Sequence, residues 1–299
     1  MVCKMSAQVL PDYNAGMTAI SPSLLISIVI YRPDAAWLKT TLASLAVALA
    51  VARNVNSIGD ASVVLVDNEA TGKDSPHRAL LASEFAAHPW LMFSVMAGHG
   101  NIGYGAANNL AVASLPLHDF VLILNPDVSL DDNAIAAGIG YLHRHADAVM
   151  VSPVATDEHG APLYLAYRYP SVAVLGLRGF ASTFVKTFFE SLLARYEFRS
   201  QGDPAFDGAL ENLELISGCF MLTRGSTFRE LGGFDENFFL YFEDFDLALR
   251  TSRLGNMVRL PACRITHAGG GASRKGFGHI RLFCRSALRF FNKHGWRWI

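Results

Sequence analysis

Four short apolar segments in the first half of the chain constrain its fold more than any other feature. Each is rich in Val, Ile and Leu, and they occupy residues 24–31, 61–66, 91–96 and 120–124. A continuous apolar run of this length is typical of a strand that is buried on both faces of a parallel sheet. Segments with helical spacing of apolar residues lie between these runs. The alternation predicts an α/β fold: a Rossmann-like, open, mostly parallel twisted sheet with helices on both faces.

The second half of the chain is less regular. Further strands are expected at residues 149–154, 214–222 and 257–260, whereas residues 175–206 predict only a helix and a loop over the site. We therefore divide the 299 residues into a loose leader at 1–22, one domain at 23–275 and a tail at 276–299.

Composition excludes several classes of protein. A formal net charge of −1 gives no general attraction to nucleic acid. Hydrophobic residues make up 51% of the chain, yet no uninterrupted apolar run reaches the roughly 18 residues of a membrane-spanning helix. The leader lacks the apolar core of a signal peptide. The four cysteines are too widely spaced for a zinc site or a disulfide framework, so we expect a reducing, cytoplasmic location. Composition leaves the oligomeric state open.

Polar residues follow each of the four predicted strands. These residues are Tyr31, the Asp67–Asn68 pair, the glycine-rich segment 98–105, and Asn125 with Asp127. Ligands of open α/β sheets bind beyond the carboxyl ends of the strands, so the four groups predict one shared crevice.

An acidic and aromatic stretch at 234–246 is the second candidate for chemistry. It holds five carboxylates among six aromatic rings: Asp235, Glu236, Glu243, Asp244 and Asp246. A carboxylate that is held among rings has a raised pKa and can accept a proton near neutral pH. The same residues also suit the N-terminus of a helix over 247–250, where the helix dipole favours negative charge. Capping needs only one acid, so we expect a chemical role for at least one of the five. Glu243 and Asp246 are expected either to orient the acceptor, meaning the molecule from which this proton is taken, or to cap this helix.

Candidate groups for a cation and an anion lie outside that stretch. Asp127 at a strand end suits Mg²⁺ or Mn²⁺, and His267 is a possible second ligand, although a turn and a structural histidine are the simpler interpretations. Arg274 and Lys275 follow a glycine-rich loop and could neutralise a leaving diphosphate, or could simply be solvated.

Gly98, Gly100 and Gly103 match the spacing of a dinucleotide-binding fingerprint. They follow the third predicted strand rather than the first, and no acidic residue ends the next strand at the required distance. We therefore discount a nicotinamide-dependent enzyme and expect these glycines to let the backbone approach a ligand.

The tail has a different character from the rest of the chain. Basic residues recur every four positions, with aromatic and aliphatic residues between them: Arg281, Arg285, Arg289, Lys293 and Arg297. This pattern fits a helix lying on the inner membrane surface, and equally a terminal helix packed on the core with a solvated basic stripe. Both interpretations stay open.

Taken together, these segments resemble the family-2 inverting glycosyltransferases with a GT-A fold, in particular their bacterial rhamnosyltransferase-like branch. The resemblance runs from about residue 26 to 294, and its motifs occur in the family's order: IVIY (28–31), VLVDN (64–68), NIGYGAANN (101–109), LNPD (124–127), SGC (217–219), GGFDENFF (232–239), FEDFDL (242–247) and HAGG (267–270).

The resemblance implies a nucleoside diphosphate sugar donor and a divalent cation. Asp67 would meet the base, Tyr31 and Pro33 would line the nucleotide, and Asn68, Asn101 and Gly103 would complete the donor site. Asn125 and Asp127 match the Asp-x-Asp metal motif, Asp244 the catalytic base, and His267 a late metal ligand. Two departures are present: Asn125 replaces the first Asp of the metal motif, and Arg32–Pro33 replaces the usual Asn.

The expected function is inverting transfer of a sugar, rhamnose from dTDP-rhamnose, to a glycan or lipid-linked acceptor. The alternative is a protein that binds a nucleotide sugar or glycan without catalysis, which the altered metal motif would allow.

Overall fold

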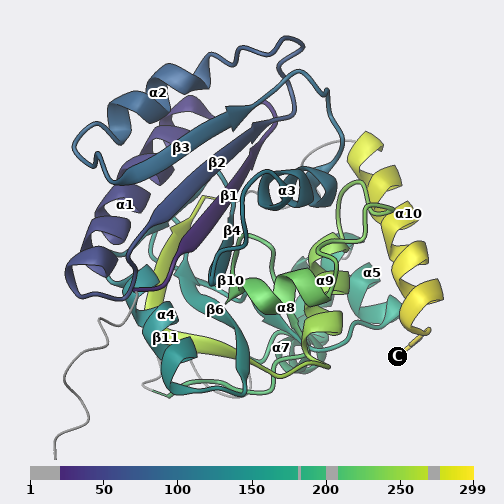
Figure 1. Cartoon of the computed structure of the whole chain (residues 1–299). Coiled ribbons are helices and arrows are strands. Elements are labelled where there is room, and N and C mark those ends of the chain that lie inside the picture. Colours follow the sequence, from purple (N-terminus) through teal and green to yellow (C-terminus); the bar gives the residue numbers. More distant parts are fainter. Residues whose placement is uncertain (1–20, 181–182, 200–207, 269–276) are drawn as a thin grey trace, which may run out of the picture.

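The computed structural model describes residues 21–180, 183–199, 208–268 and 277–299. Within these residues, nine strands form a central sheet in the order β3-β2-β1-β4-β10-β6-β11-β5, with β7 paired to β6 (Figure 1). These strands are β1 (Leu24–Ile30), β2 (Ala61–Asp67), β3 (Leu91–Met96), β4 (Phe120–Leu124), β5 (Val128–Leu130), β6 (Ala148–Thr156), β7 (Pro162–Leu163), β10 (Phe220–Arg224) and β11 (Asn256–His267). A separate small sheet pairs β8 (Ala166–Tyr167) with β9 (Leu215–Ile216).

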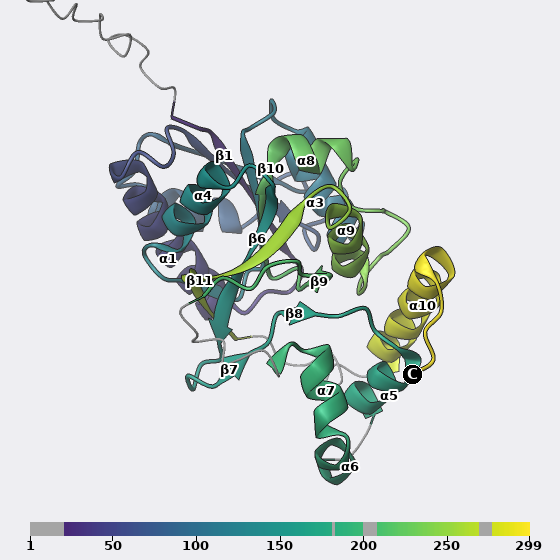
Figure 2. The same cartoon turned by 90° about the horizontal axis from the view of Figure 1, so that it is seen from below.

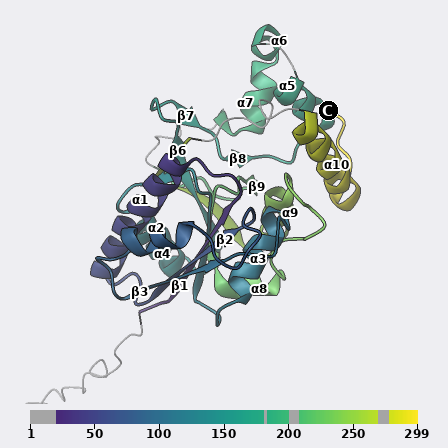
Figure 3. The ribbon, with the colours of Figure 1, turned by 90° about the horizontal axis from the view of Figure 1, so that it is seen from above.

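Helices cover both faces of the central sheet, as the sequence predicts. One face carries α1 (Ala35–Asn54), α2 (His77–Glu84) and α4 (Ala134–Arg144), and the other carries α3 (Tyr104–Ala113), α8 (Gly225–Glu230) and α9 (Glu243–Thr251) (Figures 2 and 3). The fold class expected from the sequence is therefore confirmed.

The parallel half of the sheet contains all four strands predicted from the apolar runs. β1 pairs in parallel with β2 and with β4, and β2 pairs in parallel with β3. The register sets Ile30 opposite Asp67 and Ile28 opposite Leu124. The strands therefore end along the same edge, and the polar residues that follow them lie near one another.

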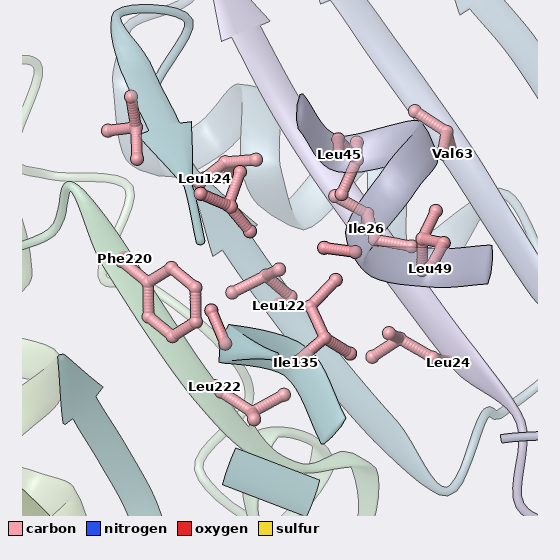
Figure 4. Packing of buried hydrophobic residues seen from close by; sticks show 14 of the residues in the cluster. Leu24, Ile26, Leu45, Leu49, Val63, Leu122, Leu124, Ile135, Phe220 and Leu222 are labelled. Atoms are coloured by element: carbon pink, nitrogen blue, oxygen red, sulfur yellow. The ribbon is translucent and has the colours of Figure 1, made fainter. Parts of the chain in front are cut away.

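The main core lies between this half of the sheet and α1 and α4. Leu24, Ile26 and Leu122 from the strands meet Leu45 and Leu49 from α1, and all have negligible exposed surface (Figure 4). Burial of each such side chain contributes about 1.5–3 kcal/mol to stability. By length and composition α1 could also cross a membrane, but its apolar face is occupied by the sheet, which identifies it as a core helix.

The second half of the sheet is mixed rather than parallel. β10 runs antiparallel to both β4 and β6, and β5 runs antiparallel to β11. The single strand expected at 214–222 is instead two strands, β9 and β10, which belong to different sheets. The chain between them, Ser217 to Cys219, is thereby left free to form the wall of a pocket.

Three helices after β8 project from the sheet together with the C-terminal helix (Figures 2 and 3). They are α5 (Val172–Phe180), α6 (Thr183–Phe188), α7 (Glu190–Tyr196) and α10 (Phe277–His294). Phe290 and Phe291 of α10 pack in a cluster with Phe238 and Phe242. Of the two interpretations of the tail, packing on the body of the protein is therefore correct for the inner face of α10.

Candidate active site

A pocket of about 500 Å³ opens where the strand ends of the sheet face the first turn of α9. Its lining includes Asn125, Asp127, Arg178, Gly218, Glu243, Asp244 and His267. The strand-end polar group after β4 and the distant acidic stretch thus meet in one cavity.

Asp127 and His267 lie side by side because β5 and β11 pair in antiparallel register. The register sets His267 opposite Val128, and the His267 Nε2 atom is 3.4 Å from Asp127 Oδ1. The backbone N–H of Ala268 donates to the Asp127 carbonyl at 3.0 Å, which extends the strand pairing to Asp127 and holds it beside His267. A β-strand longer than the one expected at 257–260 therefore carries His267 to the carboxylate.

A carboxylate oxygen and an imidazole nitrogen are suitable ligands for Mn²⁺, and the carboxylate suits Mg²⁺. Among the described residues, no group of three or more His, Cys, Asp and Glu side chains is arranged to hold a metal ion. Asp127 and His267 therefore fit a site in which two protein ligands leave the other positions to phosphate oxygens and water.

Asn125, which occupies the first position of the metal motif, is hydrogen-bonded to a residue of the pocket wall. The Tyr104 hydroxyl lies 2.8 Å from Asn125 Oδ1 and 3.0 Å from the Gly218 carbonyl. Burial raises the pKa of Tyr104 well above its usual 10, so the phenol remains a hydrogen-bond donor. The Asn125 oxygen thus accepts a hydrogen bond from Tyr104.

Asp244 is held at the start of α9 by two backbone donors. Gly218 N–H donates to Oδ2 at 2.9 Å, and Phe245 N–H donates to Oδ1 at 2.8 Å. A Cβ on residue 218 would lie 2.9 Å from the Asp244 Cβ, so glycine is required there for close approach. Burial raises the pKa of Asp244, although the hydrogen bonds from Gly218 and Phe245 act in the opposite direction.

Glu243 lies next to Asp244 and has a more unfavourable environment for charge. It is buried, and its Oε2 atom has no hydrogen-bond partner among the described residues. Burial, and then the charge of Asp244, raise the pKa of Glu243 well above its usual range. Of the two neighbouring carboxyl groups, Glu243 is therefore the one whose surroundings more strongly favour the protonated form.

The turn before Glu243 has an uncommon backbone conformation. Tyr241 and Phe242 have φ values of 69° and 66°, in the left-handed region that side chains with a Cβ rarely adopt. Each such residue costs on the order of 1–3 kcal/mol. Helix α10 supports the turn: the Phe242 ring packs on Phe283 and Phe290, and Tyr241 Oη lies 2.8 Å from His279 Nδ1. The position of Glu243 and Asp244 therefore depends on α10.

Asp246, which was expected to orient the acceptor or to cap the helix, does not line the pocket, because its carboxylate faces α10. It has no exposed surface and pairs with Arg250 Nε at 2.8 Å, Lys293 Nζ at 2.6 Å and His294 Nε2 at 2.7 Å. Asp246 joins α9 to α10 and has a structural role. Of the two residues predicted to contact the acceptor, only Glu243 lines the pocket.

The residues expected to contact the nucleotide lie along the strand-end edge, beside the pocket rather than in its lining. The buried Asp67 carboxylate accepts hydrogen bonds from Glu69 N–H, Ala70 N–H and the Ser75 hydroxyl. Tyr31 is half exposed and Pro33 partly buried. Asp67 thus organises its own turn, and its contact with a base remains a prediction.

The glycine-rich segment after β3 connects this edge to the acidic and aromatic stretch. Asn68 Nδ2 donates to the Gly103 carbonyl at 3.2 Å, and Asn101 Oδ1 accepts from Gly103 N–H at 3.1 Å. Gly103 has a φ of +90°, and a Cβ there would lie 2.6 Å from the Phe239 carbonyl. Because β3 is an edge strand, the segment that follows it lies at the margin of the sheet, and there Gly103 packs against the acidic and aromatic stretch.

Arg178 on α5 is the pocket residue that the sequence did not reveal. Its Nη2 atom donates to the Tyr167 hydroxyl at 3.2 Å, and its Nε lies 3.1 Å from Glu197. Arg178 belongs to a segment without a motif, so no signal in the sequence distinguishes it. Arg274 and Lys275, the cations that the sequence suggested instead, lie outside the described residues.

No family model matches the chain. Its sequence is 27% identical over 210 residues to N-acetylglucosaminyl-diphospho-decaprenol L-rhamnosyltransferase of Mycobacterium tuberculosis, a match that covers 66% of each chain and so slightly less than two thirds of that protein. It is 29% identical over 201 residues to rhamnosyltransferase WbbL of Escherichia coli, covering 64% of this chain and 70% of WbbL.

Two solved structures show the same fold at low sequence identity. The mannosyltransferase PcManGT from Pyrobaculum calidifontis, in complex with GDP-Man and Mn²⁺, has a TM-score of 0.56 at 14% identity, covering 91% of this chain and 65% of that one. GalNAc-T7 with UDP, GalNAc and Mn²⁺ has a TM-score of 0.54 at 12% identity, covering 90% and 50%. The chain therefore has the fold of the GT-A glycosyltransferases, and its sequence is related to those of bacterial rhamnosyltransferases.

Proposed function

We propose that this protein transfers a sugar from a nucleoside diphosphate donor to an acceptor hydroxyl, with inversion at the anomeric carbon. The observation that carries the proposal is the shared pocket, in which the Asp127–His267 pair and the Asp244 carboxylate line one cavity. The names of the sequence relatives favour rhamnose as the sugar and a lipid-linked saccharide as the acceptor. On the family resemblance we further propose dTDP-rhamnose as the donor and a cell-surface polysaccharide as the product.

In this proposal Asp244 accepts the proton of the acceptor hydroxyl as its oxygen bonds to the anomeric carbon and the diphosphate departs from the opposite face. A positioned base contributes about 10²- to 10⁴-fold to such a reaction. Burial raises the pKa of Asp244 and so makes the carboxylate a better base than a solvated aspartate. The neutral Glu243 beside it donates a hydrogen bond to the acceptor.

Other residues of the pocket lining would balance the negative charge of the leaving group. Asp127 and His267 would hold Mg²⁺ or Mn²⁺, which when bound neutralises the diphosphate. Arg178 adds a fixed positive charge to the same cavity. The Mn²⁺ in the two structural neighbours supports a divalent cation here.

The test is a transfer assay with a panel of nucleoside diphosphate sugars, each with and without Mn²⁺, on the wild type and on Asp244→Asn. We expect one donor to support transfer, with Asp244→Asn reducing the rate by about 10²- to 10⁴-fold. Donor binding, followed by thermal shift, should persist in the variant. Asp235→Asn serves as the matched control, since Asp235 lies in the same acidic stretch but outside the pocket lining.

The alternative, a binding protein without catalysis, makes a different prediction. Asn125 stands where the family motif has a carboxylate, and this substitution favours that alternative. A wild type that is stabilised by a donor but transfers no sugar to any acceptor would support it and refute the enzyme.

A further inference from the structure

The outward face of α10 and the chain end that follows it form a positively charged surface with exposed tryptophans. Residues 277–299 contain five Arg and Lys side chains and no acidic residue, although the whole chain has a formal net charge of −1. The rest of the protein is therefore acidic, and positive charge is concentrated on this one element.

Packing of α10 does not use this outward face. Its inner face is filled by Phe290 and Phe291, and by Ser286, whose hydroxyl donates to the Leu240 carbonyl at 2.8 Å. Lys293 and His294 are engaged by Asp246. These contacts account for the attachment of the helix to the body of the protein.

The residues that remain form a stripe at spacings of four, three and four: Arg281, Arg285, Leu288 and Asn292. All four are exposed. They line a shallow groove of about 770 Å³ together with Cys284, Arg289, Lys293 and one acidic residue, Asp235, which is paired with Lys293. Arg281 and Arg285 form no ion pair with any described residue. Leu288, with 53% of its surface exposed, places an apolar side chain between the charges.

Two tryptophans extend the stripe beyond the helix. Trp296 Nε1 donates to Asn292 Oδ1 at 3.0 Å, and the Trp296 ring stacks on Trp298 with ring centroids 5.1 Å apart. Trp298 is 66% exposed. Indole rings, which are apolar with one polar edge, prefer the boundary between water and lipid.

Further exposed aromatic residues lie on the same projecting group of helices. The backbone N–H of Val172, at the start of α5, donates to the Arg297 carbonyl at 2.8 Å, which ties the chain end to α5. Helix α6, which contacts α5, exposes 84% of Phe184 and 80% of Phe188 (Figures 2 and 3). Phe184 and Phe188 are four positions apart on this helix and so share one face, where they form a contiguous exposed apolar patch of the kind that marks a protein or membrane contact.

We propose that the α10 surface, defined by Arg281, Arg285, Leu288, Arg289, Trp296 and Trp298, binds the headgroup region of an anionic phospholipid bilayer. Arginines at the surface attract anionic headgroups while Leu288 and the tryptophans enter the boundary layer. The net negative charge of the rest of the chain opposes its general attraction to such a surface. Phe283 of α10 and Leu175 of α5 line the catalytic pocket, so docking would set the pocket beside the membrane.

The test is co-sedimentation of the full chain with vesicles of phosphatidylcholine, with and without phosphatidylglycerol. We expect sedimentation with the anionic vesicles only, decreasing as salt rises. Each arginine near such a surface contributes about a fivefold change in partitioning, so Arg281→Glu with Arg285→Glu should weaken binding by at least about 25-fold. Trp298→Ala should weaken it more modestly.

The matched control reverses two exposed charges elsewhere, Lys39→Glu on α1 and Arg144→Glu on α4, and should leave vesicle binding nearly unchanged. The proposal is wrong if the wild type stays in the supernatant with anionic vesicles, or if both double variants lose binding equally. Loss of a dimer in the Arg281→Glu/Arg285→Glu variant, without vesicle binding by the wild type, would instead assign the surface to a protein contact. Because vesicle binding needs neither donor nor acceptor, its failure is distinguishable from a failure of sugar transfer.

Discussion

The two sides of the pocket are built in different ways. The Asp127 side is set by strand pairing, with strand ends that share an edge and a backbone of ordinary conformation. The Asp244 side begins at two left-handed residues and is held by aromatic and ionic contacts to α10, far away in the sequence. The comparison indicates that the candidate base depends on tertiary contacts that the cation ligands do not need. Substitutions at the contact between α9 and α10 should therefore unfold the Asp244 side of the pocket while the sheet, with Asp127, stays folded.

The largest expected effect on stability comes from Phe290→Ala, which removes a fully buried ring from the contact between α9 and α10. We expect a loss of about 3–5 kcal/mol, since a large cavity replaces the ring. If the Asp244 side, with α9 and α10, is a separate unit, called here the helical side, limited proteolysis should release α10 while the sheet remains folded.

Two controls sharpen this prediction. Leu122→Ala, in the sheet core, should lower the unfolding midpoint of the whole protein without early cleavage near α10. Phe188→Ala changes an exposed ring and should have little effect on stability. Identical cleavage patterns for Phe290→Ala and Leu122→Ala would contradict the division into two units.

Asp246→Asn tests the ionic contact on the same side. Removing the buried charge leaves Arg250 and His294 without a carboxylate partner, and Lys293 with Asp235 alone, at a cost of about 3 kcal/mol. Denaturant unfolding measures the change in free energy. Asp235→Asn, which removes a partly exposed partner of Lys293, should cost less than about 1 kcal/mol. Equal losses would mean that burial of Asp246 is unimportant.

Glu243→Gln should change the pH dependence of stability. Burial and the charge of Asp244 raise the pKa of Glu243 above its usual 4.5, so the folded protein keeps a proton that the unfolded chain releases. The free energy of unfolding therefore falls as pH rises from about 4.5 through the folded-state pKa of Glu243. The variant lacks this decline and should be more stable than the wild type near neutral pH, with no advantage at pH 4. Parallel stability curves between pH 4 and 8 would contradict the prediction.

A small effect, confined to the sheet side, is expected for the cap at the start of α1. Asp34 Oδ1 accepts hydrogen bonds from Ala36 N–H at 2.9 Å and Trp37 N–H at 3.0 Å, which caps the helix. Asp34→Ala should cost about 1 kcal/mol in thermal or denaturant unfolding, without changing proteolysis near α10. A selective release of α10 in this variant would show that the two sides are coupled.

The sequence predicted the residues on the sheet side of the pocket more accurately than those on the helical side, for a physical reason. The strands at 24–31 and 120–124 are apolar on both faces, so local composition alone identifies them, and parallel pairing then implies a shared edge for Tyr31 and Asp127. The acidic stretch gives no such guide. Glu243, Asp244 and Asp246 lie within four positions, yet two face the pocket and the third faces α10, because a helix turns successive residues in different directions.

By itself, the sequence determined the α/β class, the four parallel strands, and the residue types that could carry a cation and a base. The tertiary structure alone decided that β10 enters the sheet antiparallel, that Arg178 lines the pocket, and that Asp246 serves α10. Hydrophobic periodicity is a local property and can be read along the chain. The direction in which β10 enters the sheet and the partners of the buried Asp246 carboxylate depend on which distant surfaces meet. Only the folded chain determines those contacts.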